Sequence, residues 1–170
     1  MEQACDVILF ELSVTNVDKP SLAVEDVAMR LQQFLALRND ISPYYRWGVL
    51  LTNASLFQRK ADILRQLCVQ DNTAAHGCLT FCIGTDTLVR ILDPKYYDNS
   101  YEAMLTALRM MQCRFVVGGR LEQKKNNGDF VTGAEEIQLL PADVRAMFTI
   151  LHDFRVDLSS SELRAKGCSL

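Results

Sequence analysis

The chain has 170 residues, of which 49% are hydrophobic and 23% are charged, and its formal net charge is −3. This length fits one globular domain with an ordinary core. The negative charge disfavours broad electrostatic capture of nucleic acid, which requires a basic surface. The apolar runs are too short to span a bilayer, and the run that begins at Val7 has no basic segment before it, so we expect a cytoplasmic protein that neither spans a membrane nor carries a signal peptide.

The cysteines and histidines argue against a metal site of the zinc type. The six cysteines, at positions 5, 68, 78, 82, 113 and 168, form no C-x-x-C pair. His76 and His152 are far from zinc-ligand spacing. We therefore expect reduced, mostly buried thiols.

Strand and helix patterns alternate along the chain. Residues 6–13 form an apolar run typical of a strand covered on both faces, and residues 24–35 repeat apolar side chains at helical spacing. A strand at residues 47–52 follows, and Asn53 is expected to cap the next helix. Later strands are predicted at 78–83, 113–117 and 148–151, and later helices at 85–92, 100–111 and 141–147. The alternation predicts a three-layer α/β domain with a mainly parallel sheet.

The polar loop at residues 14–21 leaves the carboxyl end of the first strand. Asn16 can donate and accept hydrogen bonds, and Lys19 offers an ammonium group suited to phosphate. Both a ligand-binding loop and a merely solvated loop fit this composition.

The strand at 78–83 runs into a helix through the turn Gly84-Thr85-Asp86. Glycine removes the Cβ that would keep a ligand from the backbone, and Thr85 or Asp86 can cap the helix. Ligands of open parallel sheets bind beyond the carboxyl ends of strands, which makes this turn a candidate site. A turn that only reverses the chain and caps a helix fits the same residues.

Two later loops also carry candidate residues. Residues 93–99 place Lys95 beside Tyr96, and the tyrosines here either stack on a planar ring or cover the edge of the core. The strand at 113–117 ends in a second glycine turn, Gly118-Gly119-Arg120.

The most specific local pattern is Leu158-Ser159-Ser160-Ser161-Glu162-Leu163-Arg164. Ser159 and Glu162 match a capping box, so a helix is predicted to begin here. Amides, three serine hydroxyls and the Arg164 guanidinium then converge, as in an anion site. A helix cap with solvated serines is the alternative interpretation.

These motifs together resemble a known family. Residues 158–164 are similar to the I-S-S-T-x-x-R signature of the HxGH nucleotidyltransferases, and residues 81–86 resemble the strand-turn G-x-D of nicotinamide mononucleotide adenylyltransferases in that superfamily. Residues 16–20, 93–97 and 115–120 are most similar to a cytidylyltransferase-like branch, some members of which are fused to a CinA-type domain. The resemblance covers nearly all of the chain.

The resemblance implies a Rossmann-like domain that transfers a nucleotidyl group from ATP or another nucleoside triphosphate to a mononucleotide, as in NAD synthesis, with Mg²⁺ and release of pyrophosphate. Carried over by position, the triphosphate would be held by Ser159, Ser160, Ser161 and Arg164. The nucleoside would be held by Gly84, Thr85, Asp86, Gly119 and Arg120, and the acceptor by Asn16, Lys19, Lys95 and Tyr96. Ser161 stands where the signature has threonine, which keeps the hydroxyl.

The chain departs from the family at the amino end. The family opens with a strand and a G-x-F-x-P-x-H-x-G-H loop that nothing here matches, and neither His76 nor His152 has a histidine two or three residues away. Those paired histidines stabilise charge on the transferring phosphate, so the resemblance predicts negligible transfer by residues 1–170 alone. A nucleotide-binding or partner-binding protein that has lost catalysis is the alternative.

The absent first strand would lie in the middle of the family's sheet. Its neighbours, at residues 7–12 and 79–83, would then lack a ladder partner and would meet directly, leave a gap or recruit a strand from another molecule. We therefore expect a homodimer, a fusion within a longer chain or a marginally stable monomer.

Overall fold

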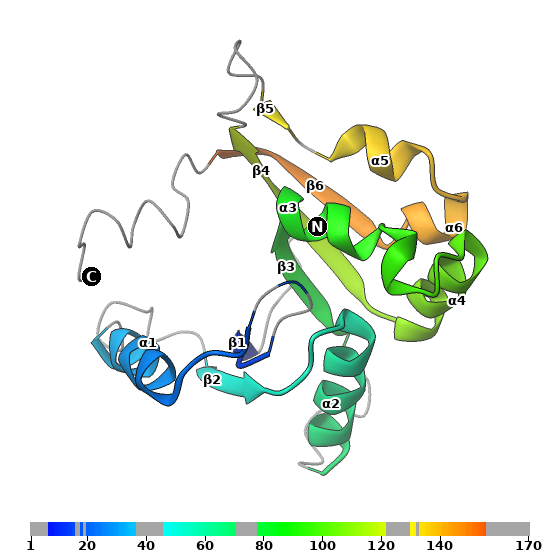
Figure 1. The fold of residues 1–170 in the computed structure, drawn as a ribbon. Helices are drawn as coiled ribbons and strands as arrows, with labels where there is room; N and C mark the ends of the chain where they lie inside the picture. The colour runs from blue at the N-terminus through cyan, green and yellow to red at the C-terminus, as the bar shows by residue number, and fades with distance from the viewer. Residues whose placement is uncertain are drawn as a thin grey trace. The chain divides into compact units, whose positions relative to one another are not determined.

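The structure, a computed structural model, describes residues 7–15, 18, 20–36, 46–70, 78–121, 130–131 and 133–155. Strands and helices alternate along these residues in a Rossmann-like α/β architecture, which confirms the predicted fold class (Figure 1). They form two compact units, one with the described residues up to Lys60 and the other with those from Ala61 onward. In the part of the chain described, no helix is long and apolar enough to cross a membrane.

The first unit is built on two parallel strands, β1 (Val7–Ser13) and β2 (Arg46–Thr52), with α1 (Val24–Ala36) between them in sequence. Their register runs from Val7 opposite Arg46 to Ser13 opposite Thr52. The Phe10 ring of β1 lies 5.1 Å from that of Phe34 in α1 and 6.0 Å from that of Trp47 in β2. One face of this strand pair therefore packs against α1. Val7 and Leu9, on the alternate positions of β1, are exposed, so the expectation of a strand covered on both faces is wrong for these residues.

The second unit contains a sheet with β4 (Arg114–Leu121) between two parallel neighbours, β3 (Thr80–Gly84) and β6 (Phe148–Arg155). The short β5 (Phe130–Val131) pairs antiparallel with the end of β4. Phe115 is completely buried, and its ring stacks on Phe81 at 5.6 Å and on Phe148 at 5.0 Å. One aromatic side chain thus joins the three parallel strands.

Helices connect these strands. The connection from β3 to β4 contains α3 (Thr85–Ile91), the 3₁₀ turn η2 (Pro94–Tyr96) and α4 (Tyr101–Met111), and α5 (Ala134–Gln138) and α6 (Ala142–Arg145) precede β6. The four α-helices of this unit just named contribute apolar side chains to the core, among them Leu88, Ile91, Met104, Leu105, Leu108, Met111, Ile137 and Val144, whereas η2 has no buried residue. The Arg109 side chain of α4 donates to the Asp143 carboxylate of α6 at 2.6 Å, so these two helices lie side by side.

The helix starts agree only in part with the sequence predictions. The helix predicted from residue 100 is α4, and Ser100 caps it by accepting a hydrogen bond from the Ala103 amide. At α3, however, the cap is Gly84 without a side-chain bond, because Thr85 is buried as the first helical residue. The helix expected directly after Asn53 is α2 (Phe57–Gln70), so Asn53 does not occupy its cap position.

The two candidate neighbours of the absent family strand lie in separate sheets. β1 pairs with β2, β3 pairs with β4, and among the described residues β1 and β3 do not pair with each other. Each of these two strands thus has a parallel ladder partner within its own sheet.

Gly133, before α5, has φ +75°, and a Cβ there would overlap Leu88 Cδ2. We expect Gly133→Ala to lower the free energy of unfolding by about 2–4 kcal/mol, because it adds both a strained φ and a steric clash. Urea unfolding measures this difference. The matched control is Gly48→Ala, whose Cβ would lie 3.6 Å from Leu9 Cδ2 in ordinary contact. Equal stability of the two variants would contradict the described docking of α5 on α3.

Burial raises the pKa of the Cys113 thiol to about 11, although the nearby Arg65 guanidinium acts in the opposite direction. The folded state therefore favours the neutral thiol more than the unfolded state does. This stabilisation is complete below the ordinary value of 9.0 and is lost as the pH rises to about 11. We expect Cys113→Ala to reduce the fall in unfolding free energy between pH 9 and pH 11, measured by denaturant titration. The control is Cys82→Ala, which removes an exposed thiol that is not among the causes of the Cys113 shift and should retain the wild-type slope.

Candidate functional site

The carboxyl edge of β3 and β4 is lined by glycine backbone. Gly84, the last residue of β3, lies opposite Gly118 in β4, and Gly119 follows. The pairing of β4 with β6 becomes irregular between Gly118 and Gly119, at the same edge. Neither member of the Gly84–Gly118 pair has a Cβ, so the two backbones are accessible where parallel sheets bind ligands.

The space beside Gly84 is open. Its backbone is extended, with φ −88° and ψ 166°, and a Cβ built there would meet no heavy atom within 4 Å. Any residue could adopt this backbone conformation, so glycine is not required here by the fold. The effect of glycine at this position is to leave the space beside the backbone unfilled by a side chain.

Two polar residues begin α3 next to this space. Thr85 is buried, and its Cγ2 would lie 3.7 Å from a Cβ at Gly133, so it faces the start of α5. Asp86 is exposed in the first turn of α3, where a carboxylate is favoured by the helix dipole and can accept hydrogen bonds from hydroxyl groups. Gly84, Thr85 and Asp86 are thus consecutive at this edge, and the buried Gly119 follows the ladder partner of Gly84; their role in nucleoside binding stays a prediction.

Lys95 and Tyr96 lie in η2, which packs chiefly against α4. The Lys95 ammonium is 4.6 Å from the centre of the Tyr96 ring and 3.3 Å from the Asp93 carboxylate. Tyr96, which has the larger effect, and Asp93 both raise the pKa of Lys95. The pKa of Asp93 is lowered, mainly because its carboxylate accepts a hydrogen bond from the Lys95 backbone amide. A role of Lys95 and Tyr96 in acceptor binding stays a prediction.

Several predicted site residues lie outside the described part of the chain. These are Asn16, Lys19, Ser159, Ser160, Ser161 and Arg164. For Arg120 the structure describes the backbone, which lies opposite Val131 of β5, but not the side chain.

The carboxyl edge of β1 and β2 holds a polar cluster that sequence reasoning missed. The Lys60 ammonium of α2 lies 2.8 Å from Glu11 Oε2, and the Thr52 hydroxyl donates to the other oxygen of Glu11. The Ser13 hydroxyl lies within hydrogen-bonding distance of the Thr15 and Ala54 carbonyls, at 2.6 Å and 2.9 Å. The available signal was Glu11 itself, a charged residue inside the otherwise apolar run 7–12.

Known proteins do not identify this chain: no family model, no curated protein and no solved structure matches it. The family resemblance therefore depends on the motifs described above. Among the described residues, no group of three or more histidine, cysteine, aspartate or glutamate side chains could hold a metal ion.

Proposed function

We propose that this chain is a nucleotide-binding domain of the nucleotidyltransferase type, which binds a nucleoside triphosphate and a mononucleotide. The observation that carries the proposal is the glycine edge of β3 and β4, with open space beside Gly84 and a carboxylate at Asp86. Paired backbone without side chains accommodates a sugar or a planar base closely, and Asp86 is suited to accept hydrogen bonds from ribose hydroxyls.

The triphosphate partner is proposed from the motif at residues 158–164 alone. Three serine hydroxyls and the Arg164 guanidinium in that segment offer the donors that phosphate oxygens require. Mg²⁺ would accompany the triphosphate, because this ion keeps much of its water and is often held by phosphate oxygens with one or two carboxylates. Asp86 is the only carboxylate among the four residues that the structure gathers at the glycine edge, so the edge fits an ion delivered with its nucleotide.

Binding without appreciable transfer is the activity proposed for this chain. Adenylyl transfer to a mononucleotide makes a dinucleotide and releases pyrophosphate, and its transition state requires stabilisation of charge on the transferring phosphate. The sequence has no paired histidines to supply it.

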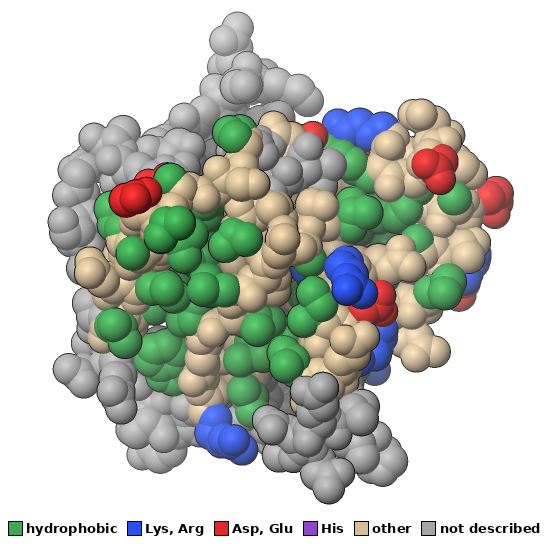
Figure 2. All heavy atoms as spheres, turned by 60° about the horizontal axis from the view of Figure 1, so that its bottom comes forward, with side chains coloured by type: hydrophobic (Ala, Val, Ile, Leu, Met, Phe, Trp, Pro, Cys, Tyr) green, Lys and Arg blue, Asp and Glu red, His purple; other side chains and the backbone are tan. Residues whose placement is uncertain are grey.

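A partner-binding protein that has lost nucleotide binding is a second candidate, and exposed apolar side chains favour it. Val7 and Leu9 alternate along β1 and are 44% and 46% exposed, although parallel strands are usually covered on both faces. Figure 2 shows hydrophobic side chains exposed over much of the face drawn. Surfaces of this kind mark protein interaction sites when they are contiguous.

The variant Gly84→Ala is expected to weaken nucleotide binding without changing the stability of the fold. We expect its free energy of unfolding to remain within about 0.5 kcal/mol of the wild type, since the added methyl group meets no protein atom. Affinity for ATP or nicotinamide mononucleotide should fall about tenfold or more, because the methyl group occupies ligand space. Calorimetric titration and urea unfolding measure the two effects. Absence of nucleotide binding by the wild type would reject the proposed function, whereas unchanged affinity in the variant would move the site elsewhere.

Arg164→Ala tests the triphosphate segment. Charge-assisted hydrogen bonds to phosphate contribute about 1.5–3 kcal/mol, so we expect ATP affinity to fall roughly ten- to a hundredfold. The control is Arg114→Ala, which removes an exposed guanidinium from the start of β4, at the end of the strand opposite the glycine edge. Equal ATP affinity of the Arg164 variant and the wild type would show that the serine-rich segment is only a helix cap.

A further inference from the structure

The strongest unexplained feature is the buried Lys60 ammonium. Lys60 lies in the first turn of α2 and is only 8% exposed. Its partner Glu11 lies on β1 with its side chain 24% exposed, and both carboxylate oxygens are engaged, one by Lys60 and one by Thr52 of β2. Glu11 is therefore fixed from two elements, and it holds the ammonium at the carboxyl edge of β1 and β2.

The ammonium has more donors than the described protein uses. Lysine carries three N–H donors. The described contacts of Lys60 Nζ are the hydrogen bond to Glu11 and the face of the Phe57 ring at 5.0 Å. Two donors thus have no oxygen acceptor among the described residues, in a side chain that is almost completely buried.

Stability alone does not account for this arrangement. Burial of the Lys60 charge costs free energy, and an apolar pair of similar volume is often as stable as a buried ion pair or more stable. A buried ammonium with one acceptor recovers little of that cost. A ligand oxygen that accepts the remaining donors would account for it.

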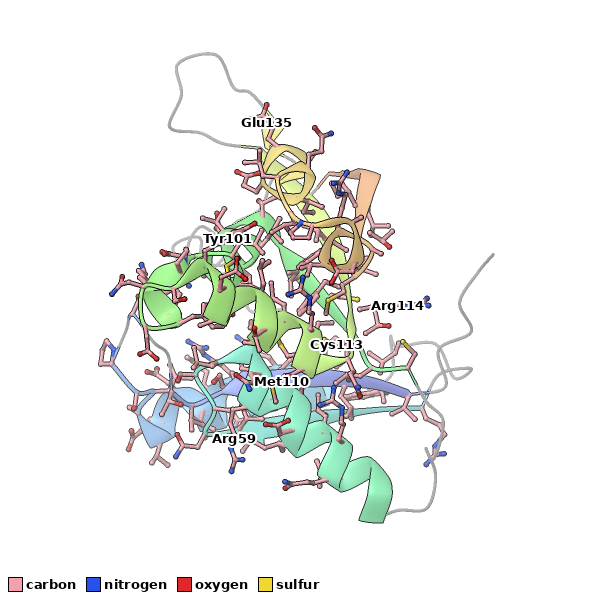
Figure 3. All side chains as sticks on the ribbon, turned by 90° about the vertical axis from the view of Figure 1, so that its right-hand side faces the viewer. Arg59, Tyr101, Met110, Cys113, Arg114 and Glu135 are labelled. Atoms are coloured by element: carbon pink, nitrogen blue, oxygen red, sulfur yellow. The ribbon has the colours of Figure 1, made fainter. Side chains whose placement is uncertain are left out.

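Local charge indicates that this ligand is an anion. The first turn of α2 contains no acidic residue, although acids are favoured there, and it contains Arg59 next to Lys60. Arg59 is exposed on the same helix, where Figure 3 labels it. The side chains of Lys60 and Arg59 together carry more charge than the single carboxylate of Glu11, and the positive end of the helix dipole lies in the same turn.

We propose that Lys60 binds a phosphate-type oxyanion at the carboxyl edge of β1 and β2, with Glu11 as the residue that positions its ammonium. Ser13 and Thr52 end the two strands at the same edge, where the Thr52 hydroxyl donates to Glu11 and the Ser13 hydroxyl is engaged by backbone carbonyls, so both support the carboxylate and its loop rather than the ligand. The oxyanion is either free phosphate or the phosphate of a mononucleotide. The inference does not depend on the glycine edge of β3 and β4, which belongs to the other compact unit.

The test uses the full chain and two probes, inorganic phosphate and nicotinamide mononucleotide, in calorimetric titrations. Lys60→Met keeps the length of the side chain and removes the charge, and we expect it to weaken binding of at least one probe about tenfold or more. The matched control is Arg109→Met, which removes a cation that is also paired with an aspartate but lies in α4, outside the proposed sites. It should leave binding of inorganic phosphate unchanged.

If Lys60→Met weakens the binding of both probes, the site accepts any phosphate group. If it weakens the binding of only one probe, the site is specific for free phosphate or for the mononucleotide, whichever probe is affected. Lys60→Met leaves the Glu11 carboxylate without its cation and could destabilise the fold. The double variant Glu11→Leu/Lys60→Met removes both charges and therefore separates loss of binding from loss of folding. We expect this double variant to remain folded by urea titration and to have lost the binding. Wild-type affinity in a folded double variant, or no binding of either probe by the wild type, would overturn the proposal. ATP binding that is sensitive to Gly84→Ala would then still stand by itself.

Discussion

The stack of Phe81, Phe115 and Phe148 fixes the register on which the candidate site depends. Phe115 is fully buried between the other two rings, one from each neighbouring strand, and Phe81 lies directly opposite it in the ladder. Three residues further along, the same register sets Gly84 opposite Gly118. A shift by one residue would send each side chain to the other face and would separate the two glycines. The core and the site are thus consequences of one strand pairing.

The buried polar residues of the described chain have a common location. These are Thr52, Lys60 and Thr85, and each lies at the carboxyl end of a parallel strand or in the first turn of the helix that follows. Buried polar groups require partners, and in each unit they concentrate where backbone leaves the sheet. Both units therefore place polar groups at the carboxyl ends of parallel strands. One unit has glycine backbone with Asp86 there, and the other has the Glu11–Lys60 pair.

The parallel strands form two separate sheets, and the sheet of β1 and β2 has only these two strands among the described residues. Two parallel strands alone, as in β1 and β2, make a small sheet, and parallel sheets are normally covered and extended on both sides. The exposed Val7 and Leu9 agree with this incompleteness. The family assignment itself depends on the sequence motifs.

The local sequence determined which segments are strands and which are helices, because periods of two and of 3.6 residues are properties of neighbouring residues. The helix that follows Ser100 and the strand that begins at Phe148 were predictable for the same reason. The pairing of Gly84 with Gly118 and the contact of Glu11 with Lys60, 49 residues away, were decided only by the tertiary structure. The Gly84 cap also depended on it, since Thr85 is buried against the start of α5. Strand neighbours and buried charge partners are set by long-range packing, which local periodicity does not contain.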